Sequence, residues 1–82
     1  MMLGWGPYLR NIVMTGNIVR QSSVGCAVSV AEGAGTALIA DNMFQDTPEG
    51  AVVGFRWNER ASGELAAGGE AFAHLTVERN RI

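Results

Sequence analysis

Apolar and polar residues alternate along this chain in short segments with a period of two. Ile12 and Met14 are separated by one residue, and the same spacing joins Cys26, Val28 and Val30. A period of two is typical of β-strands, because successive side chains of a strand point to opposite faces. The pattern predicts strands near residues 12–15, 18–20, 26–30, 37–40, 43–45, 51–56 and 75–78.

An asparagine returns in the same local setting three times, at Asn17, Asn42 and Asn80. Apolar residues stand five and three positions before each asparagine and two positions after it: Ile12, Met14, Val19, Ala37, Ile39, Phe44, Leu75, Val77 and Ile82. The first two asparagines are 25 residues apart, and the next spacing of 38 equals that period plus 13. We therefore expect an insertion within residues 56–74, forming a surface excursion with a short helical turn.

Strands this short cannot each bury an apolar face alone, but stacked coils share one continuous core. The period predicts an all-β, right-handed parallel β-helix of about three coils. The coils lie near residues 1–11, 12–36, 37–74 and 75–82. We expect Asn17, Asn42 and Asn80 to adopt the left-handed conformation at a sharp corner and to form a hydrogen-bonded ladder between coils. The alternative is that the three asparagines line a ligand groove.

Three sequence elements occur in a characteristic order within "GWGPYLRNIVMTGNIVRQSSVGCAVSVAEGAGTALIADN", which is followed by "GAVVG" and "HLTVERNRI". They are Gly-Trp-Gly, Thr-Gly-Asn and Gly-Ala-Gly-Thr-Ala. In these elements the chain resembles the C-terminal part of the twin-arginine-translocated, uncharacterised repeat proteins, a family of parallel β-helices similar in shape to pectate lyases. The resemblance is weakest over residues 57–73. It implies a periplasmic or secreted fragment of a longer protein, since members are longer and Met1 starts inside a coil.

Composition and charge exclude several classes of protein. The 82 residues are 48% hydrophobic and carry a net charge of −2, so we expect a folded domain that does not bind nucleic acid. The start "MMLGWGPYLR" has no basic region and apolar core of a signal peptide, and no segment is apolar enough to span a membrane. The single cysteine, Cys26, lies in an apolar segment and is predicted to be buried.

The sequence shows no catalytic constellation, and no cofactor or metal site is predicted. With Cys26 and Val28 facing inward, the outward positions would be Ala27, Ser29, Ala31, Val52, Gly54, Arg56, Met2, Gly4 and Gly6, of which only Arg56 offers chemistry. Asp41, Asp46 and Glu49 fall on predicted turns, and Glu64 and Glu70 fall in the insertion. His74 is expected in a supporting or surface position.

Aromatic residues next to arginines are the remaining candidates for a binding site. Tyr8 and Trp57 occupy corresponding turns beside Arg10 and Arg56, whereas Trp5 aligns with core positions. Aromatic rings and hydrogen-bonding arginines suit sugar rings, although the same side chains can simply cover the side or end of the fold.

Two functions follow from these features. The first is a non-catalytic structural or carbohydrate-associated module. The alternative is a fragment of a polysaccharide lyase or hydrolase whose catalytic residues lie upstream. The first strands carry no charge before Arg10, so we also expect self-association through exposed ends of the β-helix.

Overall fold

The computed structural model describes residues 2–67 and 72–82, and their backbone is almost entirely β-structure. The elements are β1 (Met2–Leu3), η1 (Gly6–Tyr8), β2 (Ile12–Thr15), β3 (Ile18–Arg20), β4 (Cys26–Ser29), β5 (Ala37–Ala40), β6 (Met43–Gln45), β7 (Val52–Arg56), β8 (Glu59–Glu64) and β9 (Leu75–Glu78). The expected all-β fold with largely parallel strands is confirmed, and five of the predicted strands have the observed bounds. In the described part of the chain no helix is long and apolar enough to cross a membrane.

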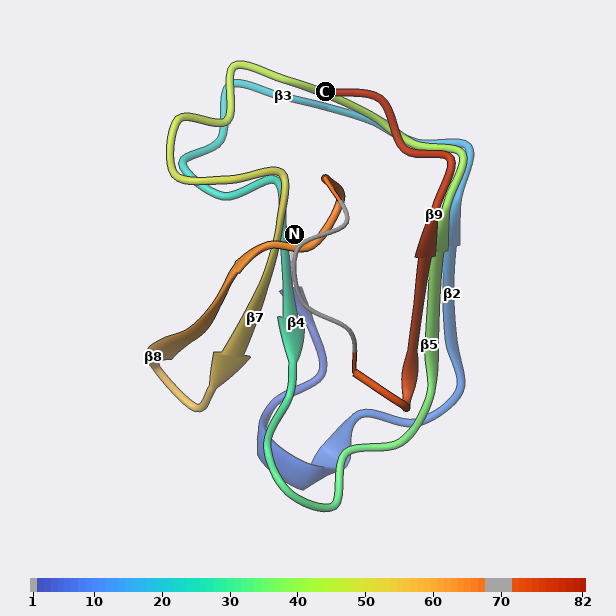
Figure 1. Cartoon of the computed structure of the whole chain (residues 1–82), viewed down its shortest axis with the longest axis vertical. Coiled ribbons are helices and arrows are strands. Elements are labelled where there is room, and N and C mark those ends of the chain that lie inside the picture. Colours follow the sequence, from blue (N-terminus) through green and yellow to red (C-terminus); the bar gives the residue numbers. More distant parts are fainter. Residues whose placement is uncertain (1, 68–71) are drawn as a thin grey trace.

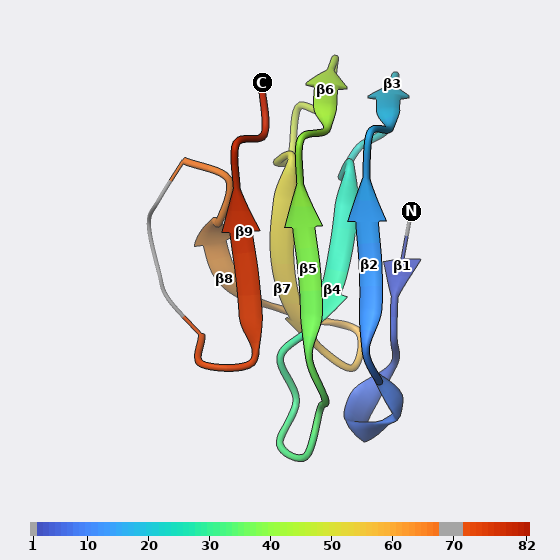
Figure 2. The same ribbon diagram turned by 90° about the vertical axis from the view of Figure 1, so that its right-hand side faces the viewer.

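The strands form three sheets on different sides of the molecule (Figure 1). Their orders are β1-β4-β7-β8, β2-β5-β9 and β3-β6. Every pair is parallel except β7 and β8. Figure 2 shows β2, β5 and β9 side by side, with β1 and β2 toward one end of the molecule and β8 beyond β7 at the other.

The pairing aligns residues at nearly constant separation. Ile12 lies opposite Ala37 and Ile18 lies opposite Met43, each 25 residues further along the chain. Between β4 and β7 the separation is 26, because Cys26 pairs with Val52. The turn before β7, residues 46–51, is one residue longer than the turn before β4, residues 21–25.

This one-residue shift corrects the prediction that Val52 points outward. Because successive strand residues face opposite sides, a slip of one position exchanges the inner and outer faces. Val52 is fully buried and belongs to the apolar core. Ser29 and Gly54, which were also expected to face outward, are buried as well.

The core lies between the three sheets and receives side chains from each of them. Its buried members are Leu3, Leu9, Met14, Cys26, Val28, Ala37, Ile39, Phe44, Ala51, Val52 and Leu65. Cys26 is among them, as the sequence predicted, and burial raises the pKa of its thiol to about 12. The burial of Phe44 and Ile39 without any exposed surface shows that even this small chain encloses a dry interior.

The described part of the insertion contains a strand rather than the expected helical turn. β8 turns back on β7, with Arg56 opposite Glu59 and Phe55 opposite Arg60. Leu65, just after β8, enters the core. The Glu64 carboxylate accepts hydrogen bonds from the backbone N–H groups of Ala51 (2.6 Å) and Val52 (2.7 Å). β8 therefore pairs along the edge of β7 that would otherwise be open. Glu70 lies outside the described residues.

Candidate functional site

Two of the predicted aromatic positions come together on the surface. The rings of Trp5 and Trp57 meet edge to face, with centroids 5.6 Å apart and an interplanar angle of 78°. Both remain accessible, at 36% and 49% exposure. Trp57 follows β7 with a left-handed backbone (φ 56°), and its ring lies over Gly6, where any side chain would collide with it. These two tryptophans form the tryptophan pair.

The position of Trp5 corrects the prediction that it belongs to the core. β1 ends at Leu3, and Gly4 then turns the chain with φ +76°. A β-carbon at Gly4 would overlap Leu9, so the chain passes very close to itself at this turn. Leu9 is buried within the core while Trp5 leaves the strand register and lies at the surface.

Tyr8 and Arg10, predicted on the same edge, have different surroundings. Tyr8 ends η1 with 74% of its surface exposed, and its backbone N–H donates to the Trp5 carbonyl at 3.0 Å. The Arg10 guanidinium donates to three backbone carbonyls, those of Pro7, Leu9 and Gly33. Arg10 thus holds two turns together, and most of its hydrogen-bonding capacity is engaged there.

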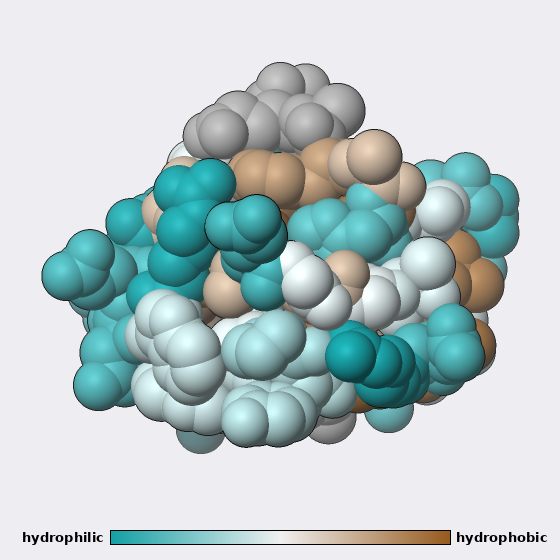
Figure 3. Space-filling view, turned by 90° about the horizontal axis from the view of Figure 1, so that it is seen from below, coloured by the Kyte–Doolittle hydropathy of each residue, from teal (hydrophilic) through white to brown (hydrophobic). Residues whose placement is uncertain are grey.

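Arg56 is exposed at the end of β7 and directly precedes Trp57. A shallow recess lies beside the tryptophan pair, and Met2, Ala27 and Phe55 contribute to its lining. Seen from below, this end of the molecule is largely hydrophilic or intermediate in hydropathy, and strongly apolar surface is confined to an upper area and one edge (Figure 3). The recess offers flat aromatic surface with a neighbouring cation, a chemistry suited to ring-shaped polar ligands.

The three asparagines are joined by hydrogen bonds at the corner between the second and third sheets. Asn17 Nδ2 donates to Asn42 Oδ1 at 3.1 Å, and Asn42 Nδ2 donates to Asn80 Oδ1 at 3.0 Å. The backbone N–H groups of Asn17 and Asn42 donate to the same two oxygens. Asn42 Nδ2 also donates to the buried carbonyl of Met14 at 3.0 Å. We call this arrangement the asparagine ladder.

The left-handed conformation expected at each asparagine belongs instead to the residue before it. Gly16 (φ 69°), Asp41 (φ 57°) and Arg79 (φ 53°) have positive φ. Each asparagine follows this bend and can then extend its carboxamide toward the neighbouring coil position. The corner is thus a two-residue feature, in which one residue turns the chain and the next supplies the hydrogen bonds.

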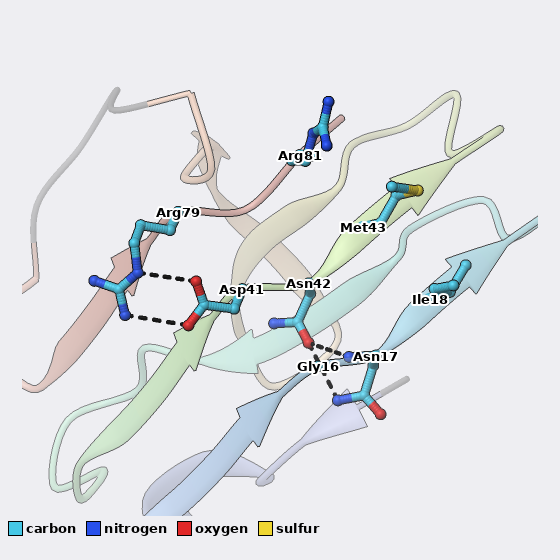
Figure 4. Close-up of a pocket in the computed structure, with 8 residues that line it drawn as sticks. All are labelled: Gly16, Asn17, Ile18, Asp41, Asn42, Met43, Arg79 and Arg81. Carbon is cyan, nitrogen blue, oxygen red and sulfur yellow. Dashed lines mark hydrogen bonds and ion pairs between the residues drawn. The ribbon is translucent and has the colours of Figure 1, made fainter.

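An open hollow of about 310 Å³ lies beside the ladder and includes Gly16, Ile18 and Met43 in its lining (Figure 4). Asp41 and Arg79 form an ion pair across it, with Nε 2.9 Å from Oδ1. The hydrogen bond from Arg79 lowers the pKa of Asp41, and Asp41 raises the pKa of the Arg79 guanidinium. The amides and charges around the hollow are mostly engaged with one another.

Other polar residues singled out in the sequence also have structural partners. His74 Nε2 lies 3.0 Å from the Ser29 carbonyl, and its ring meets Phe72 edge to face. Asp46 adopts a left-handed turn conformation (φ 57°), and the Glu49 carbonyl accepts a hydrogen bond from Arg60. Within residues 2–67 and 72–82, no three His, Cys, Asp or Glu side chains gather as a metal site would require.

Comparison with known proteins found no match among protein-family models, curated proteins or solved structures. These comparisons identify no family. The structure supports a small, mostly-β domain with parallel sheets, and the site is described by its own geometry.

Proposed function

We propose that this chain is a non-catalytic structural module, built as a short right-handed parallel β-helix of about three coils. The parallel pairing at separations of 25 and 26 residues supports this winding, as does the extra separation that the insertion introduces before β9. Such a fold presents long side surfaces on a rigid support, which suits the recognition of extended ligands.

The tryptophan pair makes the module carbohydrate-associated. The observation that carries this proposal is that Trp5 and Trp57 hold each other at the surface, although both are large apolar side chains. Exposed aromatic surface that is fixed in place is typical of a binding site, because its ordering cost is already met before the ligand arrives. A sugar ring offers C–H groups to a ring face and hydroxyl groups to the neighbouring Arg56.

Tryptophan fluorescence tests this proposal directly. We expect the emission to shift when acidic or neutral oligosaccharides are added, and the shift should saturate with concentration. Trp57→Ala should abolish it, whereas Val13→Thr, on another sheet, should leave it unchanged. Fluorescence that stays constant across a broad glycan panel would reject carbohydrate binding and leave the structural role.

The same titrations distinguish the module from a fragment of a polysaccharide lyase or hydrolase. Binding without any change in oligosaccharide length is the expected result, to be followed by chromatography of the ligand after long incubation. Shortened products formed by the purified chain would contradict the non-catalytic assignment. The lyase or hydrolase alternative places the catalytic residues upstream, so a longer protein containing this chain should receive the same assay.

A further inference from the structure

The asparagine ladder has a direction, and its two ends are chemically complementary. At each step, donors of the earlier asparagine reach the Oδ1 atom of the later one. Among the described contacts, the Oδ1 of Asn17 accepts no hydrogen bond, and the backbone N–H of Asn80 donates none. One end of the ladder therefore needs a donor, and the other end provides one.

The strands show the same asymmetry. β1, β2 and β3 are all first in their sheets, so one end of the molecule is an open edge in every sheet. Ile12 and Gly16 donate their N–H groups toward the β5 side. Because the direction alternates along a strand, the N–H of Val13 points away from β5, to the open side. Open strand edges of this kind are sites for pairing with another chain.

The opposite end is covered in only one sheet. β8 lies beyond β7, where a following strand of the first sheet would pair. β9 is last in the second sheet, and the third sheet is continued by a single bridge between Met43 and Arg81. Two of the three sheets can thus accept a further strand at this end.

We propose that copies of this chain associate head to tail, with β2 of one copy pairing alongside β9 of another. In this arrangement Asn80 of the first copy donates to Asn17 Oδ1 of the second and extends the ladder by a rung. A head-to-head contact would instead bring two acceptor ends together. β8 occupies the place of the incoming β1, a strand of only two residues, so the second and third sheets carry the contact.

The available area makes this association weak. The end of the molecule measures at most about 30 by 22 Å, so a complete contact would bury no more than roughly 1,300 Å² from both copies, near the low end of specific interfaces. Exclusion of β1 reduces that area further. We expect association in the micromolar range or weaker, and a head-to-tail contact allows species larger than dimers. The association rests on strand edges and is independent of carbohydrate binding.

Sedimentation and cross-linking test the proposal. The weight-average mass of the wild-type chain should rise with concentration. Val13→Pro removes the outward N–H without breaking a β2–β5 hydrogen bond, and it should weaken association about tenfold relative to Val13→Thr. Circular dichroism of both variants checks that each is folded.

Disulfide trapping determines the orientation even where Val13→Pro fails to fold. Val13 and Thr76 both align with Leu38, so they lie in one row across the second sheet. A mixture of the single variants Val13→Cys and Thr76→Cys should form the mixed disulfide, since Cys26 is buried. A wild-type chain that stays monomeric to its solubility limit would overturn the proposal, as would Val13→Cys pairing mainly with itself.

Discussion

Replacement of Asn42 by alanine is the most direct test of the asparagine ladder. The Asn42 side chain is only 2% exposed and takes part in four hydrogen bonds, two through Oδ1 and two through Nδ2. Asn80 takes part in three and lies at the end of the ladder, where water can replace lost partners. The central position should therefore be the more sensitive of the two.

The magnitude follows from the partners that Asn42→Ala leaves behind. The Met14 carbonyl bond is buried, and an unsatisfied buried acceptor costs about 1–3 kcal/mol. The partners at Asn17 and Asn80 are only partly buried, so water recovers part of their hydrogen bonding. We expect Asn42→Ala to lower the free energy of unfolding by about 3 kcal/mol, and Asn80→Ala to lower it by less.

Urea unfolding followed by circular dichroism measures both values. Asn42→Asp is the matched control, because it keeps the acceptor for Asn17 but loses the donor to the Met14 carbonyl, and it should also destabilise the fold. If Asn80→Ala proves more costly than Asn42→Ala, or if both are near zero, the ladder does not stabilise the stack as inferred here.

Three further outcomes are expected. Glu64→Ala should cost about 1–3 kcal/mol in urea unfolding, because the carboxylate accepts two consecutive backbone N–H groups at the edge of β7, and Glu64→Gln should cost less; equal stability of all three proteins would contradict this. The Cys26 thiol, with its pKa raised to about 12, should react with a thiol reagent at neutral pH only after unfolding, and rapid labelling of the folded chain would show that the core opens. The pKa of Asp41 is lower in the folded than in the unfolded chain, so its ion pair with Arg79 stabilises the fold above the unfolded pKa and this contribution is lost as the pH falls through the folded pKa; the stability difference between wild type and Asp41→Asn should shrink in acid and in high salt, and a difference that grows in acid would reverse the sign.

The local pattern was sufficient to predict most strands and the partners of the asparagines. A period of two and the recurring asparagine depend on near neighbours in the chain, and they correctly aligned Ile12 with Ala37 and Leu75. The burial of Cys26 followed from its apolar surroundings. These features could be predicted because each strand repeats the same demand for an inward apolar side chain.

The candidate binding surface was only partly predictable. Trp57 was expected at an edge, but its partner Trp5 was assigned to the core, because alignment with Val30 and Phe55 assumed that β1 continues past Leu3. The close approach of Gly4 to Leu9 ends that strand and brings Trp5 to the surface. Contacts between distant segments decided this outcome, and no local period contains them.

By itself, the sequence determined the strands, the spacing of the coils and the inward apolar positions, since all three arise from short-range periodicity. Only the tertiary structure decided the register of β7, where equating Gly50 with Gly25 concealed an extra residue in the turn. The insertion was left unspecified for the same reason: β8 is a strand because the edge of β7 offers it hydrogen bonds and Leu65 finds room in the core. Such choices depend on which partner surface is available, and that is known only once the whole chain is folded.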